Sequence, residues 1–168
     1  MYETDRLILR KAEFRDWKAM YRNVWSHPEA AEYMLWTVTA SEEAARDRMR
    51  KSIDFQQTHS AWLVIEKVSG QPIGFAGFRG EGGICEDTGI CVGPAFVGKG
   101  YGKEILNELV RISAEDYGAR EFIVSCRSEN AASRGMILGC DFHFSRQEPR
   151  IDQRDGTDYL LEFYQKLL

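Results

Sequence analysis

A glycine-rich segment between an apolar run and an amphipathic pattern most constrains how this chain can fold. Four of the eleven residues in Gly93–Lys103 are glycine. The residues before it, Thr88–Val92, have the composition of a strand, and apolar residues after it recur at helical spacing. Glycine lets the backbone approach a ligand closely, and the first N–H groups of a helix lack partners inside it. The segment therefore predicts an anion site, most often for phosphate, where a strand turns into a helix.

Two common nucleotide-binding loops fit this segment poorly. A P-loop would use Gly93, Gly98 and Lys99, but Gly100 stands where that loop needs a Ser or Thr hydroxyl for magnesium. A dinucleotide-binding fingerprint would need a third glycine at Lys103. Neither pattern is complete, so neither is the preferred interpretation.

The segment also resembles the acyl-CoA pyrophosphate loop of the GNAT N-acyltransferase superfamily. That loop has Gln or Arg, two free positions, glycine, one free position, and then Gly or Ala. Gly100 and Gly102 match the pattern, whereas Val97 departs from it. A glycine-rich turn that binds nothing is the remaining alternative.

Composition limits the other classes of function. The 168 residues, 43% of them hydrophobic and 29% charged, are typical of one soluble domain spanning 1–168. The net charge of −4 gives no basic surface for nucleic acid, and no apolar run approaches the roughly 20 residues of a membrane span. The acidic N-terminus does not resemble a signal peptide. We expect a cytoplasmic protein with reduced, mostly buried thiols, and the four cysteines and three histidines form no metal-binding pattern.

Hydrophobic periodicity predicts alternating strands and helices. In chain order these are a strand (7–10), a helix (16–25), a helix after residue 42, three antiparallel-type strands (62–65, 73–78 and one reaching 92), a helix to about 117, a strand (122–124), a short helix (130–138) and two strands (142–145 and 159–165). This order predicts an α/β or α+β domain, with a mixed six- to seven-stranded sheet and helices on both faces.

Local signals add four expectations. Thr39 and Glu42 have the spacing of a capping box at the start of the second helix. Gly118 is expected to end the long helix as its C-cap. The segment 80–83 is expected to be a loose connection between strands, and the densely charged segment 146–158 an exposed hairpin loop.

The resemblance to GNAT enzymes extends beyond the glycine loop to nearly the whole chain. The opening segment 3–10, the motif Asn130-Ala131-Ala132-Ser133 and Phe142 are similar to the RimJ/RimL-type branch, which acetylates ribosomal-protein N-termini. Asp141 occupies a glycine position of that branch, which is a departure. The resemblance implies a GNAT-like fold and transfer of an acetyl group from acetyl-CoA to a primary amine by direct attack in a ternary complex. A catalytically silent acyl-CoA-binding or interaction module is the alternative.

The resemblance also implies where acetyl-CoA binds. In this family the central parallel strands part in a V that admits the pantetheine arm, and the glycine loop binds the pyrophosphate. Asn130 either contacts pantetheine or simply caps a helix. The residues implied to contact the cofactor are Ile90, Cys91, Val92, Val97, Gly98, Lys99, Gly100, Tyr101, Gly102, Lys103, Asn130 and Ser133.

Acetyl transfer to an amine needs a base, a group that stabilises the developing oxyanion, and a hydrogen bond to the leaving thiolate. Asp87 and the adjacent Glu86 precede the central strand, and either could be the base. Many GNAT enzymes use a tyrosine as the acid, but Ile137 stands at that position, which leaves Ser133 as the candidate. The chemistry requires no metal.

The segment 32–38 has no clear periodicity and holds two aromatic residues and a methionine, Tyr33, Trp36 and Met34. It is either a wall of the acceptor pocket or a loop anchored on the core. The resemblance to GNAT enzymes implies that the charged segment 146–158 lines the acceptor pocket together with it. The acceptor is expected to be a protein N-terminus, a peptide or a small amine. The protein is expected to be a monomer or homodimer.

Overall fold

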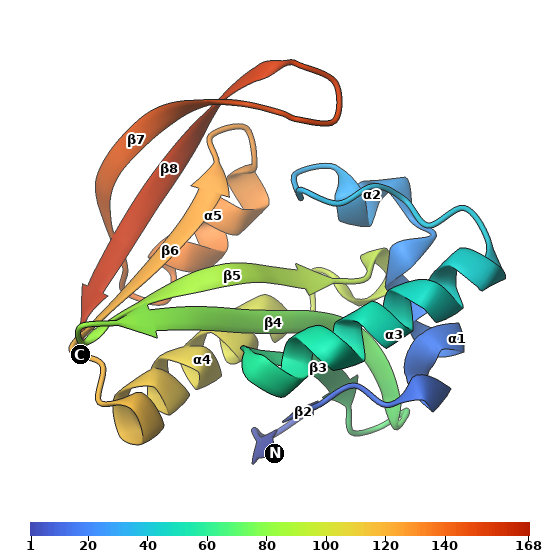
Figure 1. Cartoon of the computed structure of the whole chain (residues 1–168). Helices are drawn as coiled ribbons and strands as arrows, with labels where there is room; N and C mark the ends of the chain where they lie inside the picture. The colour runs from blue at the N-terminus through green and yellow to red at the C-terminus, as the bar shows by residue number, and fades with distance from the viewer.

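An eight-stranded mixed sheet organises the computed structural model, which describes residues 1–168 (Figure 1). Neighbouring strands are antiparallel except for β5 and β6, which are parallel. In sheet order the strands are β1 (Tyr2–Glu3), β2 (Leu7–Arg10), β3 (Ser60–Glu66), β4 (Gln71–Glu81), β5 (Ile84–Val92), β6 (Glu121–Arg127), β8 (Asp158–Leu167) and β7 (His143–Ile151). The predicted fold class is confirmed. The additional strand is β1, which at two residues is too short to have a periodic pattern.

The parallel pair β5–β6 is short, and this creates the main opening in the sheet. Only Ile84–Glu86 pair with Glu121–Ile123. Beyond these residues the two strands diverge, and β7, β8 and the end of β6 rise away from β5 (Figure 1). One edge of β5 is therefore unpaired from Asp87 to Val92.

Helices cover both faces of the sheet, as predicted. On one face lie α1 (Trp17–Met20), α2 (Pro28–Ala31) and α3 (Glu42–Thr58), and on the other α4 (Tyr101–Tyr117) and α5 (Ala131–Leu138) (Figure 1). The apolar stripe Ile105, Leu109 and Ile112 of α4 is fully buried against the strands. Gly118 ends α4 with a left-handed φ of 63°, which confirms the predicted C-cap.

The predicted helix at 16–25 is a composite. A 3₁₀ turn (Phe14–Asp16) leads into α1, and a π-helical turn (Tyr21–Trp25) follows it. Pro28 then begins α2, so the proline both ends one helix and opens the next. No helix is long and apolar enough to cross a membrane.

The capping box predicted at Thr39 and Glu42 is wrong. Ser41 is the N-cap of α3, and its hydroxyl accepts a hydrogen bond from the N–H of Ala44 at 3.1 Å. Thr39 is buried, and its hydroxyl accepts instead from Nη1 of Arg48 at 3.0 Å. Ser41 directly precedes the helix, so it reaches the free N–H groups that Thr39 does not.

Two expected connections are shorter than predicted. Gly80 and Glu81 belong to β4, so only Gly82 and Gly83 connect β4 to β5, with φ of 59° and 84°. The exposed loop predicted at 146–158 is wrong over its first half, because residues 146–151 belong to β7 and only 152–157 form the turn. As an edge strand, β7 exposes nearly every side chain, so its charges do not show the alternation of a half-buried strand.

Candidate active site

The divergence of β5 and β6 opens onto three connected cavities. The glycine-loop cavity, of about 400 Å³, lies between the segment 96–103 and α5. The cleft floor, of about 80 Å³, shares Ile90, Asn130, Ser133 and Met136 with it. The outer cavity, of about 410 Å³, shares residues 33–34, 87, 89 and 125–127 with the cleft floor. Together they form one path from the glycine loop, through the opening in the sheet, to the segment 33–36.

The glycine loop presents an unbroken run of free backbone donors. The N–H groups of residues 98–103 make no hydrogen bond to the rest of the protein. Gly98 and Gly100 adopt φ of 77° and 80°, and Gly100 is the N-cap of α4. Because the helix dipole adds positive potential at this end, the run is suited to an anion.

Neighbouring side chains fix this loop in place. Arg6 donates from Nη1 to the carbonyl of Lys99 at 2.9 Å and pairs with Glu104, on the first turn of α4, at 2.6 Å. A Cβ atom on Gly102 would lie 2.5 Å from Sδ of Met136, so a larger residue there would have to displace this side chain between α4 and α5. The loop is thus held without using its N–H groups.

The cofactor-contact residues predicted from the sequence divide into two groups. Residues 97, 98 and 100–103 border the glycine-loop cavity, as do Ile90, Val92, Asn130 and Ser133. Lys99 does not, because its ammonium lies over the ring of Phe96, 5.1 Å from the centroid. Neither does the side chain of Cys91, whose thiol is buried on the opposite face near the carbonyl of Ala30. Burial raises the pKa of the Cys91 thiol to about 12.

Asp87 lies at the point where the two strands part. Its carboxylate accepts hydrogen bonds from the N–H of Gly89 on its own strand, at 3.1 Å, and from the N–H of Ser125 on β6, at 2.9 Å. It borders both the cleft floor and the outer cavity. Burial raises the pKa of Asp87 to about 7, although both N–H donors oppose the shift. A carboxyl group that titrates near neutrality can accept a proton in this pH range.

The structure separates the other two candidate catalytic residues. Glu86 borders none of these cavities, and its carboxylate pairs with Arg79 at 2.6 Å. Ser133 borders the glycine-loop cavity and the cleft floor. Its N–H donates to Oδ1 of Asn130 at 2.9 Å, so Asn130 caps α5 and lines the cavity at the same time. The two alternatives for Asn130 are therefore compatible.

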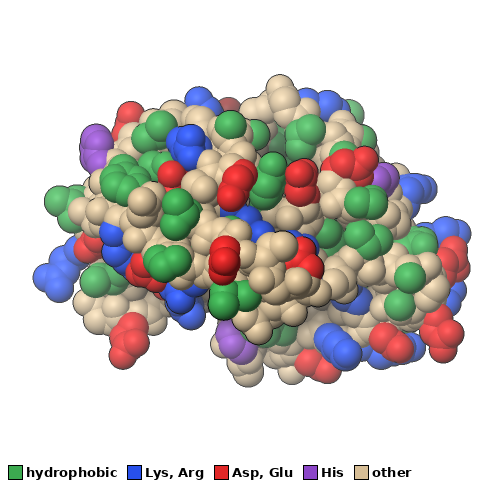
Figure 2. Space-filling view, turned by 90° about the horizontal axis from the view of Figure 1, so that it is seen from above, with side chains coloured by type: hydrophobic (Ala, Val, Ile, Leu, Met, Phe, Trp, Pro, Cys, Tyr) green, Lys and Arg blue, Asp and Glu red, His purple; other side chains and the backbone are tan.

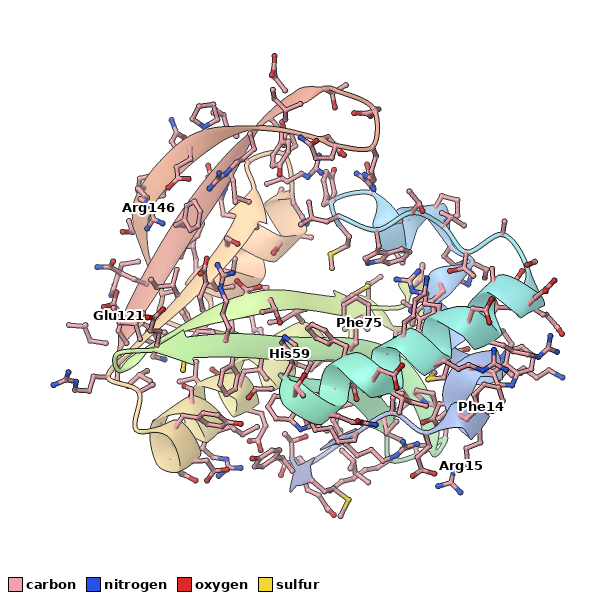
Figure 3. All side chains as sticks on the ribbon, viewed as in Figure 1. Phe14, Arg15, His59, Phe75, Glu121 and Arg146 are labelled. Atoms are coloured by element: carbon pink, nitrogen blue, oxygen red, sulfur yellow. The ribbon has the colours of Figure 1, made fainter.

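The segment 33–36 forms a wall of the outer cavity, opposite Ser125 and Arg127. Phe75, on β4, borders the same cavity from the sheet face that α3 partly covers (Figure 3). Figure 2 views the molecule from above and shows basic, acidic and hydrophobic side chains interspersed on that surface. This face therefore has no continuous basic area.

A profile of the GNAT acetyltransferase domain matches residues 6–143, most of the chain. The chain belongs to the GNAT acetyltransferase family. Membership in this family supports acyl-CoA-dependent acetyl transfer as the general reaction of the protein.

Individual relatives agree with the assignment. The FsC-acetyl coenzyme A-N(2)-transacetylase of Aspergillus fumigatus is 42% identical over 54 residues, which cover 32% of this chain and only 23% of that protein. A GNAT-family acetyltransferase from Bacillus anthracis has a similar fold, with a TM-score of 0.83, 21% identity, and coverage of 98% of this chain and 96% of the other. RimL, a ribosomal L7/L12 alpha-N-protein acetyltransferase solved with coenzyme A, has a TM-score of 0.78, 19% identity, and coverage of 98% and 96%.

Sequence reasoning missed a cluster of charges in this acetyltransferase beside the outer cavity. Arg154, in the β7–β8 turn, donates hydrogen bonds to the carbonyls of Ala31 (2.7 Å), Glu32 (3.1 Å) and Trp36 (3.2 Å). Asp152 is buried and pairs with both Arg154 and Arg127, each at 2.7 Å. The resemblance implies that the segment 146–158 lies at the acceptor pocket, but it does not identify these contacts, because the carbonyl partners of Arg154 lie far away in the sequence.

Proposed function

We propose that this acetyltransferase transfers an acetyl group from acetyl-CoA to a primary amine by direct attack in a ternary complex. The observation that carries the proposal is the run of free N–H groups at 98–103, which opens into a cleft with Asp87 at its floor. The free N–H groups can bind the phosphates of the acetyl donor, and Asp87 can act as the base for the acceptor amine.

The residues present fit an acyl-CoA. In the proposed arrangement the N–H groups of the glycine loop bind the pyrophosphate, and Gly98 and Gly100 keep the backbone accessible. The unpaired edge of β5 at Ile90 and Val92 hydrogen-bonds the pantetheine amides, as an added strand would. Asn130 keeps its side-chain N–H donors for the same arm, because its Oδ1 is occupied as a cap.

The protein residues then have distinct roles in the chemical step. The acceptor amine enters through the outer cavity, and Asp87 takes its proton directly or through one water. The amine nitrogen bonds to the thioester carbonyl carbon, and backbone donors on the open edge of β5 stabilise the oxyanion. The carbon–sulfur bond breaks, and the Ser133 hydroxyl donates a hydrogen bond to the departing thiolate. The thiolate and Asp87 then exchange protons with solvent.

We propose that the acceptor is a protein N-terminus, a peptide or a small amine. RimL is a ribosomal L7/L12 alpha-N-protein acetyltransferase, and the outer cavity of about 410 Å³ would admit a peptide N-terminus or a small amine. We therefore include protein N-termini, peptides and small amines, with the protein acting as a monomer or homodimer.

The test is release of free thiol from acetyl-CoA in the presence of pooled amines and peptides, with mass spectrometry of the products. We expect thiol release that depends on an amine, and a product heavier by one acetyl group. Binding of acetyl-CoA without amine-dependent turnover would instead indicate a catalytically silent acyl-CoA-binding module.

A further inference from the structure

A fourth cavity lies beside the outer cavity, between α3 and the sheet. This lateral cavity has a volume of about 300 Å³ and mostly aromatic and aliphatic walls. Trp36, Phe75, Thr88 and Gly89 border both cavities, so one molecule could occupy both. The proposed catalytic steps make no use of the lateral cavity.

Arg48, on α3, borders the lateral cavity and has no carboxylate partner. Its guanidinium carbon lies 4.8 Å from the ring centroid of Trp25 and 4.4 Å from that of Trp36. Nη1 donates to the hydroxyl of Thr39 at 3.0 Å and to the carbonyl of Thr37 at 3.5 Å. Nε and Nη2 of Arg48 make no hydrogen bond within the protein, since both of its hydrogen bonds come from Nη1. These two nitrogens form the edge of a guanidinium that binds both oxygens of a carboxylate.

The pairing of the neighbouring arginines makes Arg48 unusual. On the same helix, Arg46 pairs with Glu42 at 3.2 Å and Arg50 pairs with Asp47 at 2.6 Å. The side chains of both arginines are exposed to solvent. Burial lowers the pKa of Arg48 to about 10, so it remains charged at neutral pH. Arg48 is half-buried. Stacking between two aromatic rings offsets part of the cost of removing its charge from water, but the charge has no acidic partner.

The remaining charges around the cavity have the same sign. Lys51 borders it and forms no ion pair, and no aspartate or glutamate is among the residues that border it. The indole N–H of Trp36, a residue that borders both the lateral and the outer cavity, is a buried donor without a partner. The cavity therefore combines an apolar wall with unsatisfied donors and uncompensated positive charge.

We propose that the lateral cavity binds a carboxylate at the far end of the amine acceptor, with Arg48 as its partner. The proposal rests on the proposed acetyl transfer and narrows its substrate class to amines that carry an acid group beyond an apolar or aromatic spacer. The amine lies toward Asp87, the spacer lies along Phe75 and Trp36, and the acid reaches the free edge of Arg48.

A binding experiment tests the site without turnover. Because Trp25, Trp36 and Trp62 border the cavity, intrinsic fluorescence can follow titration with para-ethylbenzoate, the neutral para-ethylbenzamide and para-ethylphenyl phosphate. We expect the carboxylate to bind at least about tenfold more tightly than the amide. Arg48→Met should abolish the difference, and Arg50→Met, on the same helix but away from the cavity, should preserve it. Equal binding of acid and amide, tighter binding of the phosphate, or an unchanged preference in Arg48→Met would overturn the proposal.

A kinetic experiment connects the site to the reaction. We expect kcat/KM for para-aminoethylbenzoate to exceed that for phenylethylamine by about tenfold, and Arg48→Met to remove this advantage through KM. An active enzyme with equal kcat/KM for the two amines contradicts the acceptor class. If no amine is acetylated, the proposed function fails, and the fluorescence titration still decides whether the cavity binds a carboxylate.

Two further variants keep the test decisive if Arg48→Met does not fold. Arg48→Lys retains the charge but loses the two-donor edge, so we expect an intermediate preference for the acid. Lys51→Met changes an exposed position and should weaken binding of the acid by a smaller factor. Wild-type preference in both variants would contradict the assignment.

Discussion

At the scale of single residues, Asp87 combines a structural and a chemical role. It joins β5 to β6 where their pairing ends, and burial brings its pKa close to neutrality. The sequence could not distinguish Asp87 from Glu86, because a shift of one residue exchanges the two faces of a strand. The pairing between β4 and β5 shifts register between Gly77 and Phe78, next to these residues, and no local sequence pattern reports such a shift.

We expect Asp87→Asn to lower kcat/KM by roughly 10²-fold at neutral pH, within the usual range for a general base. The base must be deprotonated, so wild-type kcat/KM should rise as the pH increases through about 7. The deficit of the variant should shrink at higher pH, because an α-amine loses its own proton near ~8 and a lysine near ~10.4. A pH–rate profile with one acceptor measures both effects.

Glu86→Gln is the matched control for Asp87→Asn, since it neutralises the adjacent carboxylate outside the cavities. Its effect should be mild, and Ser133→Ala should cost about tenfold, because a water can replace the hydroxyl. If Glu86→Gln loses activity while Asp87→Asn does not, the assignment of the base is wrong.

At the scale of elements, the loop into α4 depends on backbone conformation more than on side chains. We expect Gly100→Val to weaken CoA binding strongly, because φ is 80° and the new side chain would crowd the free N–H groups. Lys99→Ala should weaken it only modestly, through lost charge. Calorimetric titration with CoA measures both variants.

Gly118→Val provides the stability control for Gly100→Val. It introduces similar strain, at a φ of 63°, at the opposite end of the same helix. It should lower thermal stability while leaving CoA affinity intact. Unchanged CoA affinity in a folded Gly100→Val protein would refute the loop assignment.

The sequence predicts those helices and strands in which one buried face produces a periodic pattern of apolar residues. The long helix α4 has a strong apolar stripe and a glycine at its end, and both were expected. The sequence predicts a loop over residues 146–151 of the edge strand β7, because neither face of this strand is well buried. The sequence predicts the N-cap of α3 at Thr39 instead of Ser41, because it does not reveal that Arg48 binds the Thr39 hydroxyl away from the helix start.

At the scale of the whole molecule, Arg154 fastens the β7–β8 turn to the segment that walls the outer cavity. Its partners Ala31, Glu32 and Trp36 lie across the opening of the cleft. Hydrogen bonds from Arg154, and then from Arg127, hold the pKa of Asp152 well below its usual range, so the carboxylate stays charged at all physiological pH values. The resemblance to a family could predict the parted strands, but not this contact between distant parts of the chain.

We expect Arg154→Met to raise the acceptor KM several-fold, because the segment 31–36 loses three hydrogen bonds. CoA affinity should hardly change, since the glycine loop lies on the other side of the cleft. Arg150→Met, in the exposed part of β7, is the control and should leave both constants unchanged. If Arg154→Met lost CoA affinity and kept a normal acceptor KM, the contact would support the CoA site and not the acceptor pocket.

The three-residue pairing of β5 with β6 also has a mechanical consequence. Two blocks of sheet meet at Ile84–Glu86 and Glu121–Ile123, so the junction can act as a hinge. A CoA molecule that forms hydrogen bonds with the free edge of β5 and also contacts α5 would bridge the two blocks. At a free CoA concentration of about a hundred times its Kd, binding would stabilise the folded protein by about 2.7 kcal/mol. Hydrogen exchange should then slow at 87–92 and 124–127 when CoA is added, and unchanged exchange there would mean that the two blocks are already rigid without it.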